Sequence, residues 1–118
     1  MSIDEKARDL GRLIGQSPEY QAFKRANEAL GADQAALDML RQMEKLRMDA
    51  QQMMQRGERP TEEMERELDQ LLGKIQVNAT YQRLLVAQEN FDKVMGKVNE
   101  WILEGIERGA ASPIITLS

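Results

Sequence analysis

The sequence contains no cysteine and no histidine among its 118 residues. Without cysteine the chain has no disulfides, thiolate nucleophiles, zinc ribbons or iron–sulfur ligands, and it suits a reducing intracellular compartment. Without histidine it lacks serine–histidine and cysteine–histidine nucleophile systems, HExxH zinc sites and the Glu-x-x-His pairs of helical di-iron bundles. Carboxylates, lysines and tyrosines remain as acids and bases, but we expect no enzyme.

Basic charge, phosphate loops and long apolar runs are also lacking. The formal net charge is −4, which argues against direct nucleic-acid binding, because such binding depends on Lys and Arg neutralising phosphates. No glycine-rich phosphate loop follows a strand-like segment. No stretch approaches the roughly 18 apolar residues of a membrane span, and residues 1–5 do not resemble a signal peptide. We therefore expect a cytoplasmic, soluble protein that binds neither nucleic acid nor membrane.

The composition that remains is typical of helices packed on helices. Hydrophobic residues make up 42% of the chain and charged residues 31%, but aromatic residues only 4%, the balance of a helical bundle or a coiled coil. A chain of this length forms one domain. We place that domain at residues 1–108 and expect a short apolar tail at 109–118, which would dock on a neighbour or fray.

A heptad pattern predicts one long helix near the C-terminus. Its apolar spacing of three and four follows Tyr81, Leu84, Gln88, Phe91, Met95, Val98, Ile102 and Gly105. Such a repeat keeps one seam facing a partner helix. At a rise of about 1.5 Å per residue the helix would be roughly 40 Å long, too long for its own chain to cover completely. This length predicts a homo-oligomer, a dimer or larger, or a place in a mixed complex.

Capping signals divide the rest of the chain into four further helices. Hydroxyl, carboxyl or amide side chains suited to N-caps precede each apolar stripe, at Ser2, Ser17, Asp33, Thr61 and Asn78. The interruption at residues 57–61 contains glycine and proline and predicts a tight turn, so the third and fourth helices should form an antiparallel hairpin. The predicted fold is all-α, a helical hairpin bundle of about five helices with a long C-terminal heptad helix.

Two surfaces are candidates for self-association or partner docking. The first lies on the long helix and comprises Phe91, Val94, Met95, Val98, Trp101 and Ile102. The second lies on the methionine-rich hairpin and comprises Met48, Met53 and Met54, since flexible thioethers suit adaptable surfaces. The alternatives are ordinary core filling for the methionines on the apolar stripe, and a covering role over the first helix for Trp101.

An acidic run in the fourth helix raises the alternative of a carboxylate metal or acid–base site. Its members are Glu62, Glu63, Glu65, Glu67 and Asp69. Helical geometry spreads these side chains around the cylinder, so a solvated helix face is favoured. We predict no catalytic, cofactor-binding or metal-binding residues, and a carboxylate-based metalloenzyme remains as a competing hypothesis.

Several short segments of the chain follow one another in an order and at a spacing that resemble those of a known family. They are Lys6 to Leu10, Ser17 to Tyr20, Asp33 to Met43, Gln51 to Glu63 with Gly57 and Pro60, and Asn78 with Tyr81 to Leu84. Over residues 3–106 the sequence is similar to the YlbF/YmcA family of small helical bacterial regulatory proteins. The resemblance implies a non-enzymatic regulatory or adaptor protein that acts by helix-mediated association.

The resemblance also implies partners. The better known members join paralogues and a YaaT-like protein in a complex that modulates an RNase Y-like nuclease, and so influence RNA decay, competence, sporulation and biofilm formation. Some members carry a cysteine-bearing tail linked to iron–sulfur binding. This chain has no cysteine and resembles the shorter members, so that property is not carried over. The alternative function is a structural coiled coil, or a chaperone-like holdase that grips apolar segments with the methionine-rich hairpin.

Overall fold

The computed structural model describes residues 2–111, which form five helices joined by short connections and contain no strand. The helices are α1 (Ile3–Gly15), α2 (Pro18–Ala32), α3 (Gln34–Gln55), α4 (Glu62–Gln76) and α5 (Ala79–Ala111). The predicted all-α fold, with five helices and a long C-terminal helix, is confirmed. α5 is 33 residues long and extends past both ends of the predicted heptad. The tail predicted at 109–118 lies mostly outside the described residues, and only its first three positions continue α5.

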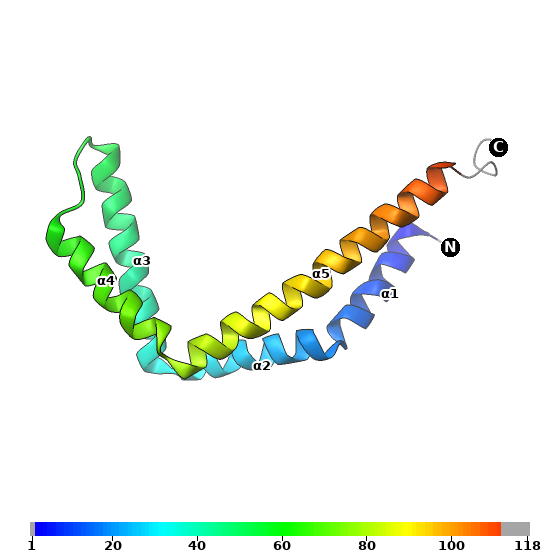
Figure 1. Cartoon of the computed structure of the whole chain (residues 1–118), viewed down its shortest axis with the longest axis horizontal. Coiled ribbons are helices and arrows are strands. Elements are labelled where there is room, and N and C mark those ends of the chain that lie inside the picture. The colour runs from blue at the N-terminus through cyan, green and yellow to red at the C-terminus, as the bar shows by residue number, and fades with distance from the viewer. Residues whose placement is uncertain (1, 112–118) are drawn as a thin grey trace.

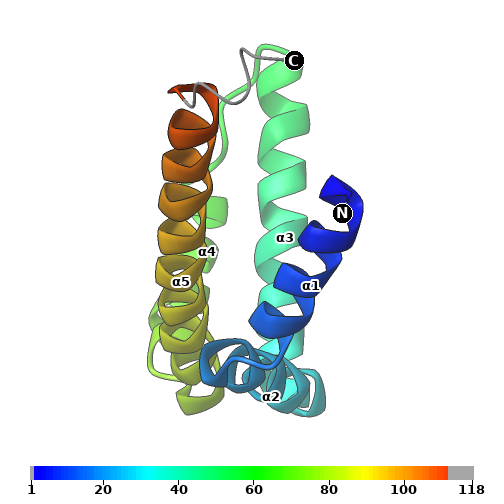
Figure 2. The ribbon, with the colours of Figure 1, turned by 90° about the vertical axis from the view of Figure 1, so that its right-hand side faces the viewer.

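The helices form two arms that meet at a vertex (Figure 1). One arm is the antiparallel hairpin of α3 and α4, as the turn at residues 57–61 predicted. In the other arm α5 runs beside α2, and α1 continues from α2 towards the outer end of the arm (Figures 1 and 2). The molecule measures 68 × 37 × 19 Å, and its smallest dimension is about that of two adjacent helices. The result is an open V and not a closed bundle.

Each helix begins at a side-chain cap that the sequence predicted. In every case the side-chain oxygen accepts a hydrogen bond from the backbone N–H three residues later; the caps are Ser2, Ser17, Asp33, Thr61 and Asn78. These bonds satisfy N–H groups that have no partner inside the helix. The positions where the chain changes direction are therefore set by local chemistry.

Two of these caps also bond to each other and hold the vertex together. Asp33 accepts the Ala36 N–H at 3.1 Å and the Asn78 side-chain amide at 3.3 Å. Asn78 in turn accepts the Tyr81 N–H at 2.9 Å. The bond from the Ala36 N–H, followed by those from the Thr80 and Asn78 side chains, lowers the pKa of Asp33 below its ordinary value. This polar link joins the α2–α3 connection to the α4–α5 connection.

The hydrophobic core is small and is centred on the same vertex. Leu30, Ala36 and Ile75 are buried together, and the hydrophobic residues packed around them are Leu37, Met39, Leu40, Met43, Tyr81 and Leu84. Ile75 is the most enclosed large side chain, with 1% of its surface exposed. Farther out, each arm is only a thin layer of helices, so most apolar side chains there are covered on one side.

Candidate protein-binding surfaces

The first half of the predicted seam on α5 packs largely within the chain. The ring of Phe91 stacks on Phe23 of α2 with centroids 5.8 Å apart, and Tyr20 meets the same ring edge-on at 5.3 Å. Val98 is buried, and Val94 and Met95 are half-buried. These four residues of the first candidate surface therefore contribute mainly to the contact between α5 and its neighbours, and the area they offer to another molecule is limited.

The far end of α5 is different, because its apolar side chains are exposed. Trp101 is 60% exposed and Ile102 44%, and the sequence had singled out both. Leu103 and Ile106 are each 59% exposed. At 100° per residue these four side chains spread around more than half of the helix, so a single neighbouring helix does not cover them. A helix segment that is apolar on most sides is ordinarily buried.

α1 adds further uncovered apolar surface to this arm. Ile3 is 90% and Leu13 66% exposed, whereas Leu10 and Ile14 are half-buried, and α1 has no buried residue. Figure 1 shows α1 and the outer half of α5 at the same end of the molecule, where both described termini lie. We call the exposed set the distal apolar surface; it comprises Ile3, Leu13, Trp101, Ile102, Leu103 and Ile106. The sequence indicated an apolar face on α1 but not that it would lie open.

A shallow groove borders this surface at Trp101. It is lined by Glu19, Asn90, Lys93, Val94, Lys97 and Trp101. Lys93 lies 3.7 Å from Glu89 along the same helix, whereas Lys97 forms no ion pair with the residues that the structure describes. The groove thus combines a large aromatic side chain with a neighbouring cation, a pairing suited to a segment that carries apolar and acidic residues.

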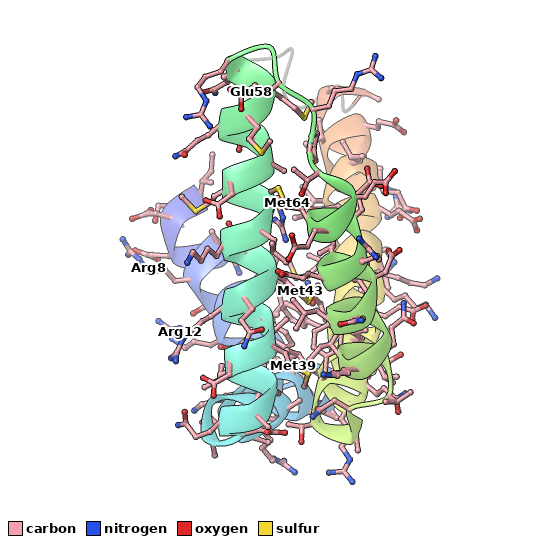
Figure 3. The ribbon with its side chains drawn as sticks, turned by 90° about the vertical axis from the view of Figure 1, so that its left-hand side faces the viewer. Arg8, Arg12, Met39, Met43, Glu58 and Met64 are labelled. Atoms are coloured by element: carbon pink, nitrogen blue, oxygen red, sulfur yellow. The ribbon has the colours of Figure 1, made fainter. Side chains whose placement is uncertain are left out.

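The hairpin arm carries the second candidate surface. Met48 is 52% and Met54 65% exposed, whereas Met53 is half-buried. Figure 3 shows Met39, Met43 and Met64 between α3 and α4. Those three methionines fill the space inside the hairpin, as the core-filling alternative predicted for residues on the stripe.

An apolar groove also runs between α3 and α4. We call it the hairpin groove; it has a volume of about 220 Å³ and is lined by Met43, Leu46, Arg47, Ala50, Pro60, Met64, Glu65 and Leu68. Its apolar residues are half-buried, and Arg47 and Glu65 are exposed. The sequence identified the apolar residues as a helix face, but the groove depends on how the two helices meet.

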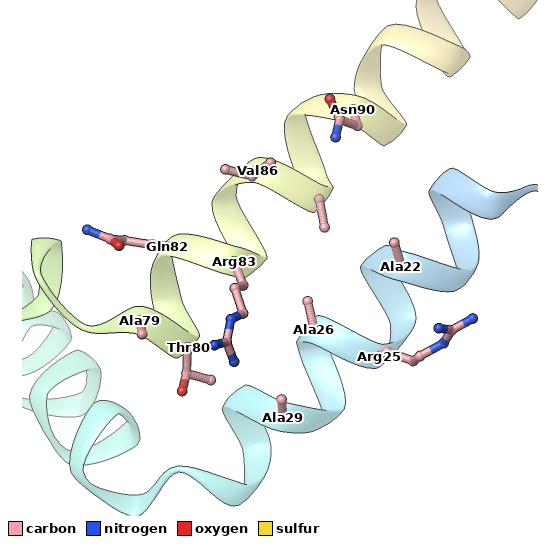
Figure 4. A pocket seen from close by; sticks show the side chains of 11 residues that line it. Ala22, Arg25, Ala26, Ala29, Ala79, Thr80, Gln82, Arg83, Val86 and Asn90 are labelled. Atoms are coloured by element: carbon pink, nitrogen blue, oxygen red, sulfur yellow. The ribbon is translucent and has the colours of Figure 1, made fainter.

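A hollow wider than these two grooves lies between α2 and α5, and Figure 4 shows the side chains around it. Much of its lining consists of small residues, among them Ala22, Ala26, Ala29 and Ala79. Arg25 and Arg83 also line it, and both are exposed. Alanines on one face of α2 were visible in the sequence but gave no functional signal. The hollow offers a shallow surface without a buried polar group.

Within residues 2–111 the acidic side chains do not gather into a metal-binding group of three or more. All five acidic residues of the run in α4 are exposed, on a solvated helix. None of the described helices combines the length and apolarity needed to span a membrane.

Comparison with known proteins gives consistent matches along nearly the whole chain. Residues 3–107 match the family model described as control of competence regulator ComK, YlbF/YmcA. A UPF0342 protein of Alkalihalophilus pseudofirmus is 28% identical over 112 residues, which cover 95% of each chain. UPF0342 proteins of Bacillus cereus and Bacillus thuringiensis are each 24% identical over 106 residues, which cover 90% of each chain. The family description supports a regulatory role in general.

Proposed function

The chain belongs to the YlbF/YmcA family, and from this we propose that it is a non-enzymatic regulatory adaptor that binds another protein through helix-on-helix contacts. The partners that the family resemblance implies are a YaaT-like protein, paralogous members and an RNase Y-like nuclease. The regulated process would be RNA processing or decay, with effects on competence, sporulation or biofilm formation.

The distal apolar surface is the observation that carries this proposal. Six large apolar side chains lie exposed along α1 and the outer end of α5. Removing apolar surface from water contributes about 25 cal/mol per Å², so covering this surface would favour association. Four of the six lie close together on the outer end of α5, and a patch of exposed apolar surface on a small protein commonly marks an interaction site. We assign partner binding to this surface.

The groove beside Trp101 suggests what the partner presents. Tryptophan is enriched among the residues that dominate binding energy, because its ring buries a large area with little loss of conformational freedom. Lys97 lies on the same groove and would attract a carboxylate. The expected partner segment is an amphipathic helix that places one large apolar side chain against Trp101 and an acidic residue near Lys97.

The experiment is a mild cross-linking pull-down of the tagged protein from its native cells, with and without RNase treatment. The wild-type chain is compared with Trp101→Glu/Ile102→Glu and with the matched control Val77→Glu/Val86→Glu, whose valines are 76% and 59% exposed elsewhere in the fold. We expect one main partner, of the YaaT-like or nuclease class, that resists RNase treatment and is lost only from the first variant. Equal recovery from both variants would show that the distal apolar surface does not bind the partner.

The exposed Met48 and Met54 support a second candidate function, a chaperone-like holdase. A holdase would suppress aggregation of unrelated unfolded proteins and would bring down many proteins in small amounts. Substitution of both methionines by glutamine should remove that suppression while partner recovery stays unchanged. If the wild-type protein does not slow aggregation, the holdase function is wrong.

A further inference from the structure

The hollow between α2 and α5 carries positive charge on a protein whose formal net charge is −4. Arg25 lines it from α2 and Arg83 from α5, and no carboxylate lines it among the residues that the structure describes. Neither arginine forms an ion pair within residues 2–111. Five other arginines each pair with a nearby carboxylate; they are Arg8, Arg12, Arg41, Arg47 and Arg56. The hollow thus holds two cations that no acidic side chain of the described fold neutralises.

The floor of the same hollow is apolar and consists of short side chains. Ala26 of α2 is half-buried, Ala87 of α5 is buried, and Val86 beside them is 59% exposed. The hollow extends along α5 from Ala79 to Asn90, which is about 17 Å or three helical turns. Side chains this short let the axis of a third helix lie about 8 Å away, at the close end of the usual range for packed helices.

The shallow form of the hollow favours a helix over a small anionic molecule. Small-molecule sites enclose most of their ligand and hold it with a few precisely placed polar groups, whereas none of the polar side chains that line this hollow is buried. In Figure 4 the side chain of Arg83 extends over the gap between the two helices, and Arg25 points outward from α2. The cations therefore lie at the rim, where charged side chains of a docked helix would meet them.

We propose that this hollow binds an acidic amphipathic helix of another protein, with small apolar residues of that helix on the alanine floor and its carboxylates beside Arg25 and Arg83. A guanidinium can bind a carboxylate through two parallel N–H···O bonds, which fix the orientation of the helix as well as attract it. The rest of the chain is acidic overall, so it repels an acidic helix elsewhere and directs it to this site.

This site does not depend on the proposed function. The distal apolar surface lies on α1 and the outer end of α5, whereas the hollow lies along the half of α5 next to the vertex (Figure 1). A shallow hollow of three helical turns offers less than the roughly 800 Å² that each partner buries in a standard interface, so we expect a weak and short-lived contact. The Val77→Glu/Val86→Glu variant should keep the main partner of the distal apolar surface and lose this contact, because Val86 lines the hollow.

Site-specific photo-cross-linking in the native cells tests the site, because it captures short-lived contacts. A benzophenone amino acid replaces Ala22, an exposed residue that lines the hollow, and mass spectrometry identifies the segment that it joins. We expect a segment of another protein with helical apolar spacing and a net negative charge.

Two charge variants show whether the arginines hold this segment. Arg25→Glu/Arg83→Glu should reduce the yield of the adduct at least about 10-fold. Lys24→Glu/Lys74→Glu makes the same change in net charge at exposed positions outside the hollow and should leave the yield unchanged. Far-UV circular dichroism should show the same helix content for both variants and the wild type.

A charge swap across the contact completes the test. Replacing the acidic residue of the captured segment nearest to the cross-link by arginine should restore the yield with Arg83→Glu to within about 3-fold of the wild type. The proposal would be overturned by the absence of an adduct, by equal yields from the two charge variants, or by an adduct with RNA, with a second copy of this chain or with a segment that lacks acidic residues.

Discussion

At the scale of single residues, stability is concentrated at the vertex. Ile75 is the only large side chain in the described residues with less than 2% of its surface exposed, and it packs with Leu30 and Ala36 from the neighbouring elements. Its burial joins the hairpin arm to the start of the α5 arm. Because this thin molecule encloses few side chains, its free energy of unfolding depends heavily on each of them.

Truncating this residue should therefore be costly. Ile75→Ala removes three buried carbon atoms and leaves a cavity, which lowers the free energy of unfolding by about 3 kcal/mol. Val77→Ala, two residues away but 76% exposed, should change it by less than about 0.5 kcal/mol. Urea unfolding at one fixed protein concentration measures both. If Ile75→Ala and Val77→Ala both changed the free energy of unfolding by a similarly small amount, the vertex would not be the principal core.

The link between Asp33 and Asn78 predicts a pH dependence of stability. The pKa of Asp33 is lowered in the folded protein, mainly by the bond from the Ala36 N–H. Its ionised form therefore stabilises the fold above the ordinary carboxyl pKa, and this contribution is lost as the pH falls through about 4 towards the folded-state value. Asp33→Asn keeps a capping oxygen but no longer titrates.

We expect the difference in melting temperature between the wild type and Asp33→Asn to be largest near pH 7 and to shrink below about pH 4. Differential scanning calorimetry across that interval measures the difference. A value that stays constant with pH would show that the charge of Asp33 does not stabilise the vertex.

Residue-level prediction from sequence was good for caps and poor for their contacts. Each of the five caps has the expected acceptor three residues before the N–H it binds. The bond between Asp33 and Asn78 joins residues 45 positions apart. Local spacing carries no information about which caps meet across the fold, so this bond could not be predicted.

At the scale of elements, the turn between α3 and α4 sets the hairpin. Gly57 has φ of 79°, and the Glu58 N–H donates to the Met53 carbonyl at 2.8 Å while the Gly57 N–H donates to the Met54 carbonyl at 3.1 Å. This pair of bonds is the Schellman arrangement, which ends a helix at a residue in the left-handed region. The glycine and proline predicted the turn but not this bonding pattern.

Adding a methyl group at this turn should strain it. Gly57→Ala forces a non-glycine residue into the left-handed region and should lower the free energy of unfolding by about 1 kcal/mol. Gly73→Ala adds the same group inside α4, where nothing lies within 4 Å, and should raise it by about 0.5 to 1 kcal/mol. Chemical denaturation measures both changes. If both substitutions changed the free energy of unfolding in the same direction, the helix-ending role of Gly57 would be contradicted.

The long helix shows why the apolar face of a helix can be predicted better than the packing of other helices against that face. Its heptad predicted a long helix and its apolar face, although α5 is longer than the heptad, and α2 has only 15 residues against 33 for α5. α2 therefore covers only the first half of the seam, where Phe91 packs. Periodicity identifies the face that is apolar; the lengths and directions of other helices decide how much of it is covered.

At the scale of the whole molecule, the open V separates two surfaces that the sequence could only name as candidates. Trp101, Ile102, Met48 and Met54 are exposed, whereas Val98 is buried within the chain. The angle between the arms follows from packing at the vertex and has no signature in a one-dimensional pattern. That the exposed residues bind a partner and that the hairpin arm takes part in self-association remain predictions.

Hydrogen exchange measured by mass spectrometry tests this division most directly, with the wild-type protein at about 1 µM and about 100 µM. We predict slower exchange at the higher concentration in the segments around the hairpin groove, residues 43–68, and unchanged exchange at residues 101–111, which only a partner would protect. Exchange independent of concentration throughout the chain, or slowed only at residues 101–111, would contradict the account.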